Sequence, residues 1–153
     1  MTHTVVLVVE TFDRRLGSSV DHPVFAWFGA AMPPPLRVAV IDDDEELRFA
    51  LADLLTSLSH VVGCFADGPS YLEAHADFRP DVIISDFHMP GLTGIEMVRE
   101  LRARGAETPA ILITAYATEA TRKASEDAGF LAMLKKPFDT DEFVRVIEAT
   151  ANL

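Results

Sequence analysis

The sequence contains very little cysteine, and this scarcity excludes two kinds of small protein. Cys64 is the single cysteine in a chain of 153 residues, so neither an internal disulfide framework nor a cysteine-based zinc site is available. It lies in the apolar run at residues 61–65, where a cysteine usually behaves as a small hydrophobic core residue. We therefore expect Cys64 to be buried and structural.

Basic residues and long apolar runs are also scarce. The 13 Lys and Arg residues stand against 24 Asp and Glu residues, which gives a formal net charge of −11. A phosphate backbone repels such a chain and no stripe of Lys or Arg offsets this, so we expect no direct binding to nucleic acid. No apolar run approaches the roughly 20 residues of a membrane span, and the short run at residues 4–9 lacks the basic flank of a signal peptide. A cytoplasmic protein without membrane contact is expected.

From residue 36 onward, short apolar segments alternate with longer helical patterns. The apolar segments predict strands at residues 36–41, 61–66, 81–85, 110–114 and 131–134. A first helix is predicted from the three- and four-residue spacing of Leu47, Leu51, Leu54, Leu55 and Leu58. Further helices are predicted at residues 70–76, 93–104, 118–127 and 140–151, with Gly105 and Gly129 as stops. This order predicts an α/β fold, (βα)₅, with a doubly wound, five-stranded parallel sheet of the flavodoxin-like kind.

Residues 1–35 do not join this pattern, so the predicted domain occupies residues 36–153. The segment closes with Met32-Pro33-Pro34-Pro35, and consecutive prolines favour an extended linker over a helix or strand. Two interpretations stay open. The segment is either a flexible or docking extension, or the product of a mis-assigned start with Met32 as the true first residue.

Several carboxylates are predicted to meet at one edge of the sheet. The first strand is followed by the acidic run at residues 42–46, and the third strand by Asp86. Like charges brought together raise one another's pKa, and a divalent cation with oxygen ligands, such as Mg²⁺, relieves the repulsion. An acidic run can also be a solvated helix start, where it complements the helix dipole. We favour that role for the two glutamates and a functional role for Asp42, Asp43 and Asp86.

A hydroxyl and an ammonium group are predicted at the same edge. The fourth strand ends in Thr114, which is followed by the small Ala115, and the fifth strand leads into Lys136. Together they provide hydrogen bonding and positive charge for the oxygens of a phosphoryl group on a carboxylate. Neither residue is informative alone, because a strand-end threonine and a surface lysine are both common. Their shared position is the signal.

These residues resemble the landmarks of the response-regulator receiver family over residues 36–153. Asp42 and Asp43 are similar to its acidic pair, Asp86 to its phosphoacceptor, Thr114 to its hydroxyl, and Lys136-Pro137 to its lysine and cis-proline. The resemblance implies that Mg²⁺ is bound directly by Asp43, Asp86 and the backbone carbonyl of His88, with Asp42 acting mainly through water. It also implies that Thr114, Ala115 and Lys136 contact the phosphoryl group.

The resemblance further implies a mechanism and partners. Asp86 would attack the phosphohistidine of a sensor histidine kinase or histidine phosphotransfer protein, so the chain would be a signalling switch and not an enzyme of its own. A downstream protein would recognise the face formed by the fourth helix, fifth strand and fifth helix. His88 and Tyr116, two residues beyond Asp86 and Thr114, would set the lifetime of the phosphorylated state. The family commonly has an aromatic residue where this chain has Met133, which puts the usual route to the output face in doubt.

Two other functions compete with this one. The segment at residues 38–44 also fits the strand-then-DxD pattern of haloacid dehalogenase-like phosphatases, with Asp42 as nucleophile and Asp44 as general acid, but that interpretation leaves Asp86 unexplained. A pseudo-receiver that works without phosphorylation would typically lack an acidic or lysine landmark, and this chain keeps them all. Because the sequence ends just after the last predicted helix, we expect a stand-alone receiver.

Overall fold

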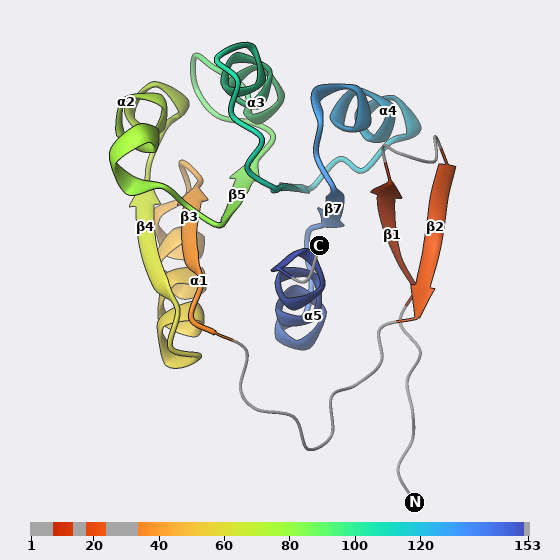
Figure 1. Cartoon of the computed structure of the whole chain (residues 1–153), viewed down its shortest axis with the longest axis horizontal. Coiled ribbons are helices and arrows are strands. Elements are labelled where there is room, and N and C mark those ends of the chain that lie inside the picture. Colours follow the sequence, from red (N-terminus) through yellow and green to blue (C-terminus); the bar gives the residue numbers. More distant parts are fainter. Residues whose placement is uncertain (1–7, 14–17, 24–33, 152–153) are drawn as a thin grey trace, which may run out of the picture.

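A five-stranded parallel sheet forms the centre of the computed structural model, which describes residues 8–13, 18–23 and 34–151. Its strands lie in the order β4-β3-β5-β6-β7 and confirm the predicted fold. Their bounds are Arg37–Ile41 for β3, Val61–Phe65 for β4, Val82–Asp86 for β5, Ala110–Thr114 for β6 and Ala132–Lys135 for β7. Because neighbouring strands run in parallel, their carboxyl ends all lie at one edge of the sheet (Figure 1).

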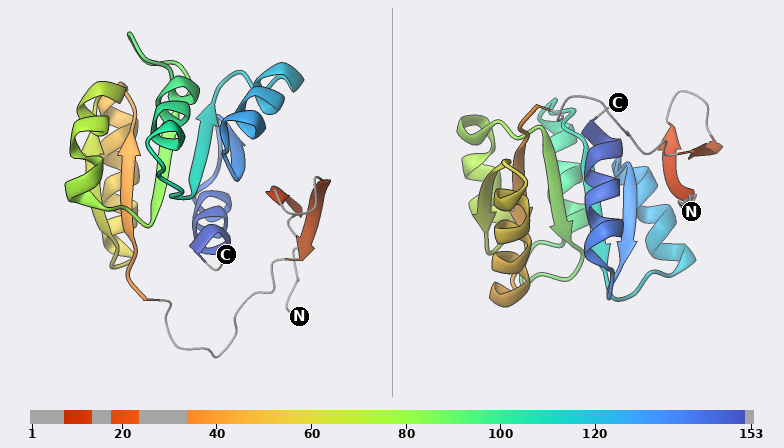
Figure 2. Two further views of the ribbon diagram at one scale, coloured as in Figure 1. Left: turned by 45° about the horizontal axis from the view of Figure 1, so that its top comes forward. Right: turned by 90° about the horizontal axis from the view of Figure 1, so that it is seen from below.

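Helices cover both faces of this sheet (Figure 2). The helices α1 (Glu45–Ser57) and α5 (Thr140–Ala151) pack on one face, while α2 (Gly68–Phe78), α3 (Gly94–Ala103) and α4 (Glu119–Ala128) pack on the other. Alternate strand residues supply the two cores: Val40 and Ile84 face α1 and α5, whereas Ile41 and Ile83 face α2 and α3. The central strands are buried on both sides, which explains why they are continuous apolar runs in the sequence.

Side-chain caps fix where four of the helices begin. The carboxylates of Asp44 and Asp67 accept the backbone N–H groups of Leu47 and Ser70. The hydroxyls of two threonines do the same for α3 and α4, in the pairs Thr93–Glu96 and Thr118–Thr121. Each cap satisfies a backbone donor that has no partner inside its helix. The predicted stops are confirmed as well, since Gly105 and Gly129 have φ of 87° and 103°, a conformation that favours glycine.

The expectation that Cys64 is buried is wrong. Cys64 is exposed, although it belongs to an apolar strand. The reason is the position of β4, which is an edge strand of the five-stranded sheet. Val61 in the same strand is 47 % exposed. An apolar run alone does not tell an edge strand from a central one.

Two strands lie in the segment before the domain. The strands β1 (Val8–Asp13) and β2 (Ser18–Pro23) pair antiparallel and form a separate two-stranded sheet. β1 lies beside β7, the other edge strand of the large sheet (Figure 1). The Met32 start and most of the proline-rich segment fall outside the described residues. Both interpretations of residues 1–35 therefore stay predictions.

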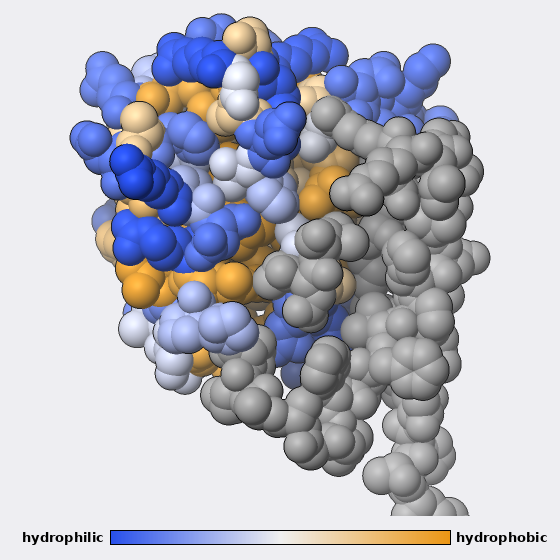
Figure 3. Space-filling view, viewed as in Figure 1, coloured by the Kyte–Doolittle hydropathy of each residue, from blue (hydrophilic) through white to orange (hydrophobic). Residues whose placement is uncertain are grey.

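The surface over α2, α3 and α4 is mostly hydrophilic (Figure 3). In α4 the buried residues are Ser125 and Ala128, and the remaining positions are dominated by charged and small polar side chains. Within the part of the chain that the structure describes, no helix has both the length and the apolar character needed to cross a membrane.

Candidate functional site at the carboxyl edge of the sheet

Three aspartates converge where β3 and β5 end. Asp42 directly follows β3, and Asp86 is the last residue of the neighbouring β5. One carboxylate oxygen from each of Asp42, Asp43 and Asp86 lies within 4.8 Å of the other two. Asp42 is 0 % and Asp86 7 % exposed, whereas Asp43 is exposed to solvent. The predicted meeting of these side chains is present in the structure.

The first turn of α1 fixes the orientation of Asp42. The backbone N–H of Asp44 donates to Asp42 Oδ1 over 2.9 Å, and Arg48 Nη1 donates to the backbone carbonyl of Asp42 over 2.7 Å. Arg48 was not identified from the sequence, because its role depends on how the loop folds back against the helix. The Asp44 contact orients the carboxylate of Asp42, and the Arg48 contact holds its backbone.

Lys136 joins the two buried carboxylates from the far side of β6. Its Nζ atom lies 3.0 Å from Asp86 Oδ1 and 3.3 Å from Asp42 Oδ2. The backbone N–H of Lys136 donates to the carbonyl of Thr114 over 2.8 Å, which fixes the end of β7 beside β6. The Lys136–Pro137 peptide bond is cis, as the resemblance implied.

Burial and repulsion from a nearby carboxylate raise the pKa of both buried carboxylates. Burial raises the pKa of Asp42, and the nearby charge of Asp86 raises it further, against the opposing effects of the Asp44 amide and Lys136. Burial also raises the pKa of Asp86, with repulsion from Asp43 adding to it and Lys136 opposing it. Burial would lower the pKa of Lys136, but its hydrogen bond to Asp86 and the charges of both aspartates raise it instead. A cation beside the aspartates would relieve this repulsion.

Thr114 lies at the same edge, fully buried at the end of β6. Its Oγ accepts the backbone N–H of Tyr116 over 3.0 Å, so the hydroxyl hydrogen remains able to donate. Ala115 is exposed, and the rings of His88 and Tyr116 meet edge to face with centroids 5.4 Å apart. These two rings therefore stand together beside the strand ends that carry Asp86 and Thr114.

Met133 occupies a different part of the fold. It lies in β7 opposite Leu112 of β6 and is partly buried against the core under α3 and α4. The Met133 side chain therefore packs on the face of the sheet that α4 covers.

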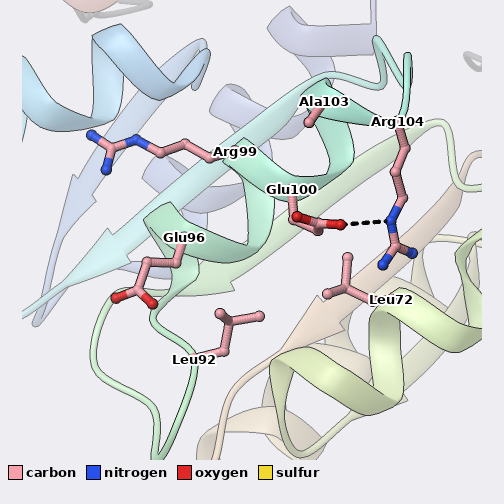
Figure 4. A pocket seen from close by; sticks show the side chains of 7 residues that line it. All are labelled: Leu72, Leu92, Glu96, Arg99, Glu100, Ala103 and Arg104. Carbon is pink, nitrogen blue, oxygen red and sulfur yellow. Dashed lines mark hydrogen bonds and ion pairs between the residues drawn. The ribbon is translucent and has the colours of Figure 1, made fainter.

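One hollow in the surface lies away from these residues. It opens between α2 and α3, where Leu72 and Leu92 form an apolar floor and Glu100 pairs with Arg104 at the rim (Figure 4). None of the converging aspartates lines it.

The comparison with protein families decides what kind of domain this is. The model of the response regulator receiver domain matches residues 38–148, which contain all three aspartates, Thr114 and Lys136. The chain belongs to the response regulator receiver family. It is thus a receiver domain of a two-component response regulator, a signalling domain.

Individual relatives agree with this assignment. The receiver domain is 36 % identical over 115 residues to the response regulator MprA of Mycobacterium sp. (strain KMS), covering 75 % of this chain and 50 % of MprA. It is 34 % identical over 119 residues to the transcriptional regulatory protein FixJ of Azorhizobium caulinodans, covering 78 % of this chain and 56 % of FixJ. The chain thus spans about half the length of these two curated relatives.

Solved structures show the same fold. The chemotaxis protein CheY4 of Vibrio cholerae is similar with a TM-score of 0.73 and 27 % identity, covering 76 % of this chain and 99 % of that structure. The receiver domain of the Francisella response regulator 1452 gives a TM-score of 0.73 and 26 % identity, with 76 % and 97 % covered. The similarity thus extends over nearly the whole of both solved domains.

Proposed function

We propose that Asp86 accepts a phosphoryl group from the phosphohistidine of a sensor histidine kinase or a histidine phosphotransfer protein. The single observation that carries this proposal is the convergence of the Asp86 carboxylate with Asp42, Asp43 and the Nζ of Lys136. Lys136 contacts both buried aspartates, and of the two Asp86 is the more accessible, with 7 % of its surface exposed against 0 % for Asp42. The geometry therefore favours Asp86 over Asp42 as the nucleophile, against the phosphatase alternative.

The reaction uses side chains that are already in place. An oxygen of Asp86 attacks the phosphorus and forms a P–O bond, while the P–N bond to the donor imidazole breaks and its nitrogen keeps the electron pair. Lys136, 3.0 Å from Asp86 Oδ1, balances the negative charge of the phosphoryl oxygens. Water later hydrolyses the acyl phosphate and returns Asp86 to its carboxylate.

The three aspartates fit a hard divalent cation. They provide oxygen ligands close enough to share one ion, and the partly open edge leaves room for the several waters that Mg²⁺ keeps. We assign Asp43, Asp86 and the backbone carbonyl of His88 as direct ligands, with Asp42 acting mainly through water. Mg²⁺ at this position would neutralise charge on the transferring phosphoryl group.

Phosphorylation is proposed to change the face formed by α4, β7 and α5, where a downstream protein would bind. Thr114 can donate its hydroxyl hydrogen to a phosphoryl oxygen, and Lys136 would move with the same group. The exposed Ala115 lies next to Thr114 and leaves space for the phosphoryl oxygens. Met133 replaces a rigid ring with a flexible chain, so the change would spread by repacking and not by a single ring rotation.

Phosphorylation by acetyl phosphate tests the proposal without a partner protein. The chain incubated with Mg²⁺ should gain one phosphoryl mass, and Asp86→Asn should gain none. Asp127→Asn is the matched control, because Asp127 is an exposed aspartate on α4 away from the site. Phosphorylation of Asp86→Asn at the wild-type level would contradict the proposal.

A further inference from the structure

We propose that Ser85 is a positioning residue that fixes the path of the backbone from Asp86 into the loop carrying the His88 carbonyl. This inference rests on the proposed function, because it concerns how the loop is arranged for Mg²⁺. Ser85 lies in β5 directly before Asp86 and is fully buried. The mechanism above does not use this side chain.

The side chain of Ser85 binds the peptide group that follows the phosphoacceptor. Ser85 Oγ donates to the backbone carbonyl of Asp86 over 2.9 Å. The N–H of the same peptide group, which belongs to Phe87, donates to the carbonyl of Ile113 over 3.0 Å. Both polar atoms of the Asp86–Phe87 peptide are therefore held, one by a side chain of β5 and one by the neighbouring β6.

The start of α3 completes this arrangement. The backbone N–H of Gly94 donates to the carbonyl of Phe87 over 3.0 Å, so the loop is joined at its two ends. A Cβ atom on Gly94 would overlap the Asp86 carbonyl and lie 2.7 Å from Ser85 Oγ. Glycine is required here for the close approach, since any larger residue would push α3 away from the serine and the carbonyl.

These contacts fix the backbone that leads to the His88 carbonyl, the proposed metal ligand. The carbonyls of Asp86 and Phe87 both accept hydrogen bonds that turn them toward the protein, and the next carbonyl is that of His88. A ligand on a loop binds tightly only when groups behind it hold the loop in one conformation. Without the hydroxyl of Ser85, the Asp86–Phe87 peptide can rotate, and the His88 carbonyl is no longer confined.

The test compares two buried serines that make the same kind of bond. Ser125 on α4 is also fully buried, and its Oγ donates to the carbonyl of Arg122 over 2.7 Å. Ser85→Ala and Ser125→Ala should therefore lose similar stability in thermal melts. Gly94→Ala disturbs the Ser85 contact from the other side.

Two readouts separate positioning from folding. Amide hydrogen exchange of residues 87–94, measured without Mg²⁺, should rise in Ser85→Ala and Gly94→Ala but stay at the wild-type level in Ser125→Ala. The dissociation constant for Mg²⁺ from calorimetry should rise about tenfold in the first two variants, as typical for the loss of a group supporting a ligand. Unchanged exchange in Ser85→Ala, or equal effects in Ser125→Ala, would overturn the inference. If the wild-type chain takes up no phosphoryl group, the proposed function fails, while the exchange experiment still decides the role of Ser85.

Discussion

Lys136 and Asp86 form an ion pair of 3.0 Å across the end of β6, although Asp86 ends β5 and Lys136 follows β7, two strands that are not neighbours in the sheet. The pair places the ammonium group of Lys136, which follows the edge strand β7, beside Asp86 at the end of the central strand β5. It thereby links the place where phosphorylation is proposed to the α4–β7–α5 face.

Replacing Lys136 should slow phosphorylation more than replacing the adjacent Lys135 does. We expect Lys136→Met to slow phosphorylation by acetyl phosphate about a hundredfold, because one preorganised charge is lost from the phosphoryl oxygens. Lys135→Met is the control, since Lys135 is adjacent but exposed. Rates come from intact mass measured over time. Equal rates in the two variants would show that the ion pair has no part in the reaction.

The aromatic pair His88–Tyr116 should determine how long the phosphorylated state lasts. The ring centroids are 5.4 Å apart, and we expect the two rings to flank the approach of water to a phosphoryl group on Asp86. The double substitution His88→Asn and Tyr116→Glu should speed phosphate release on the order of tenfold, which corresponds to about 1.4 kcal/mol in the barrier. Release is measured in excess Mg²⁺, with Phe49→Ala, an exposed aromatic on α1, as the control. An unchanged or slower rate in the double variant contradicts this role.

A chain that begins at Met32 should fold and become phosphorylated like the full chain. In the part of the chain whose burial is described, the residues of the two hydrophobic cores lie at position 36 or later, and the β1–β2 pair forms its own sheet. Thermal melts of both chains measure the difference. A loss of stability of more than about 2 kcal/mol on removing residues 1–31, well above the usual effect of a surface change, would show that the segment packs on the domain.

His75 should make stability depend on pH. Its ring lies 2.6 Å from the buried Tyr71 hydroxyl, and burial together with the charges of Arg102 and Arg104 lowers the pKa of His75 below 6.5. The unfolded chain then binds a proton at higher pH than the folded one. The contribution of His75 to stability is therefore fully present above pH 6.5. It is lost as the pH falls through the pKa of His75 in the folded chain.

The comparison with His75→Gln isolates this effect. Between pH 7.5 and about pH 5.5, the free energy of unfolding from urea melts should fall more in the wild type than in the variant, because other groups titrate equally in both. The same decrease in both chains would show that His75 does not contribute.

Much of this architecture could be predicted because it follows from short-range patterns. The strand at residues 110–114 and the helix at residues 140–151 were predicted with the bounds that the structure has. Asp42, Asp86, Thr114 and Lys136 could be brought together on paper because parallel strands end at one edge. The pattern determines which residues reach that edge, whatever the order of the strands.

The rest depends on the path of the chain in three dimensions. The exposure of Cys64 follows from β4 lying at the edge of the sheet, which periodicity does not reveal. The contacts of Arg48 and Ser85 with backbone carbonyls depend on loop conformation, and neither residue type signals such a bond in advance. The pairing of β1 with β2 was not predicted either, since that segment has no clear alternation of apolar and polar residues.

The most direct test of the central claim is to locate the phosphoryl group on the chain. Borohydride reduces an aspartyl phosphate to homoserine, which peptide mapping places at one residue. After reaction with acetyl phosphate and Mg²⁺, the account predicts homoserine at position 86 and none at position 42. Homoserine at Asp42 with Asp86 unmodified would contradict it and support the phosphatase-like alternative.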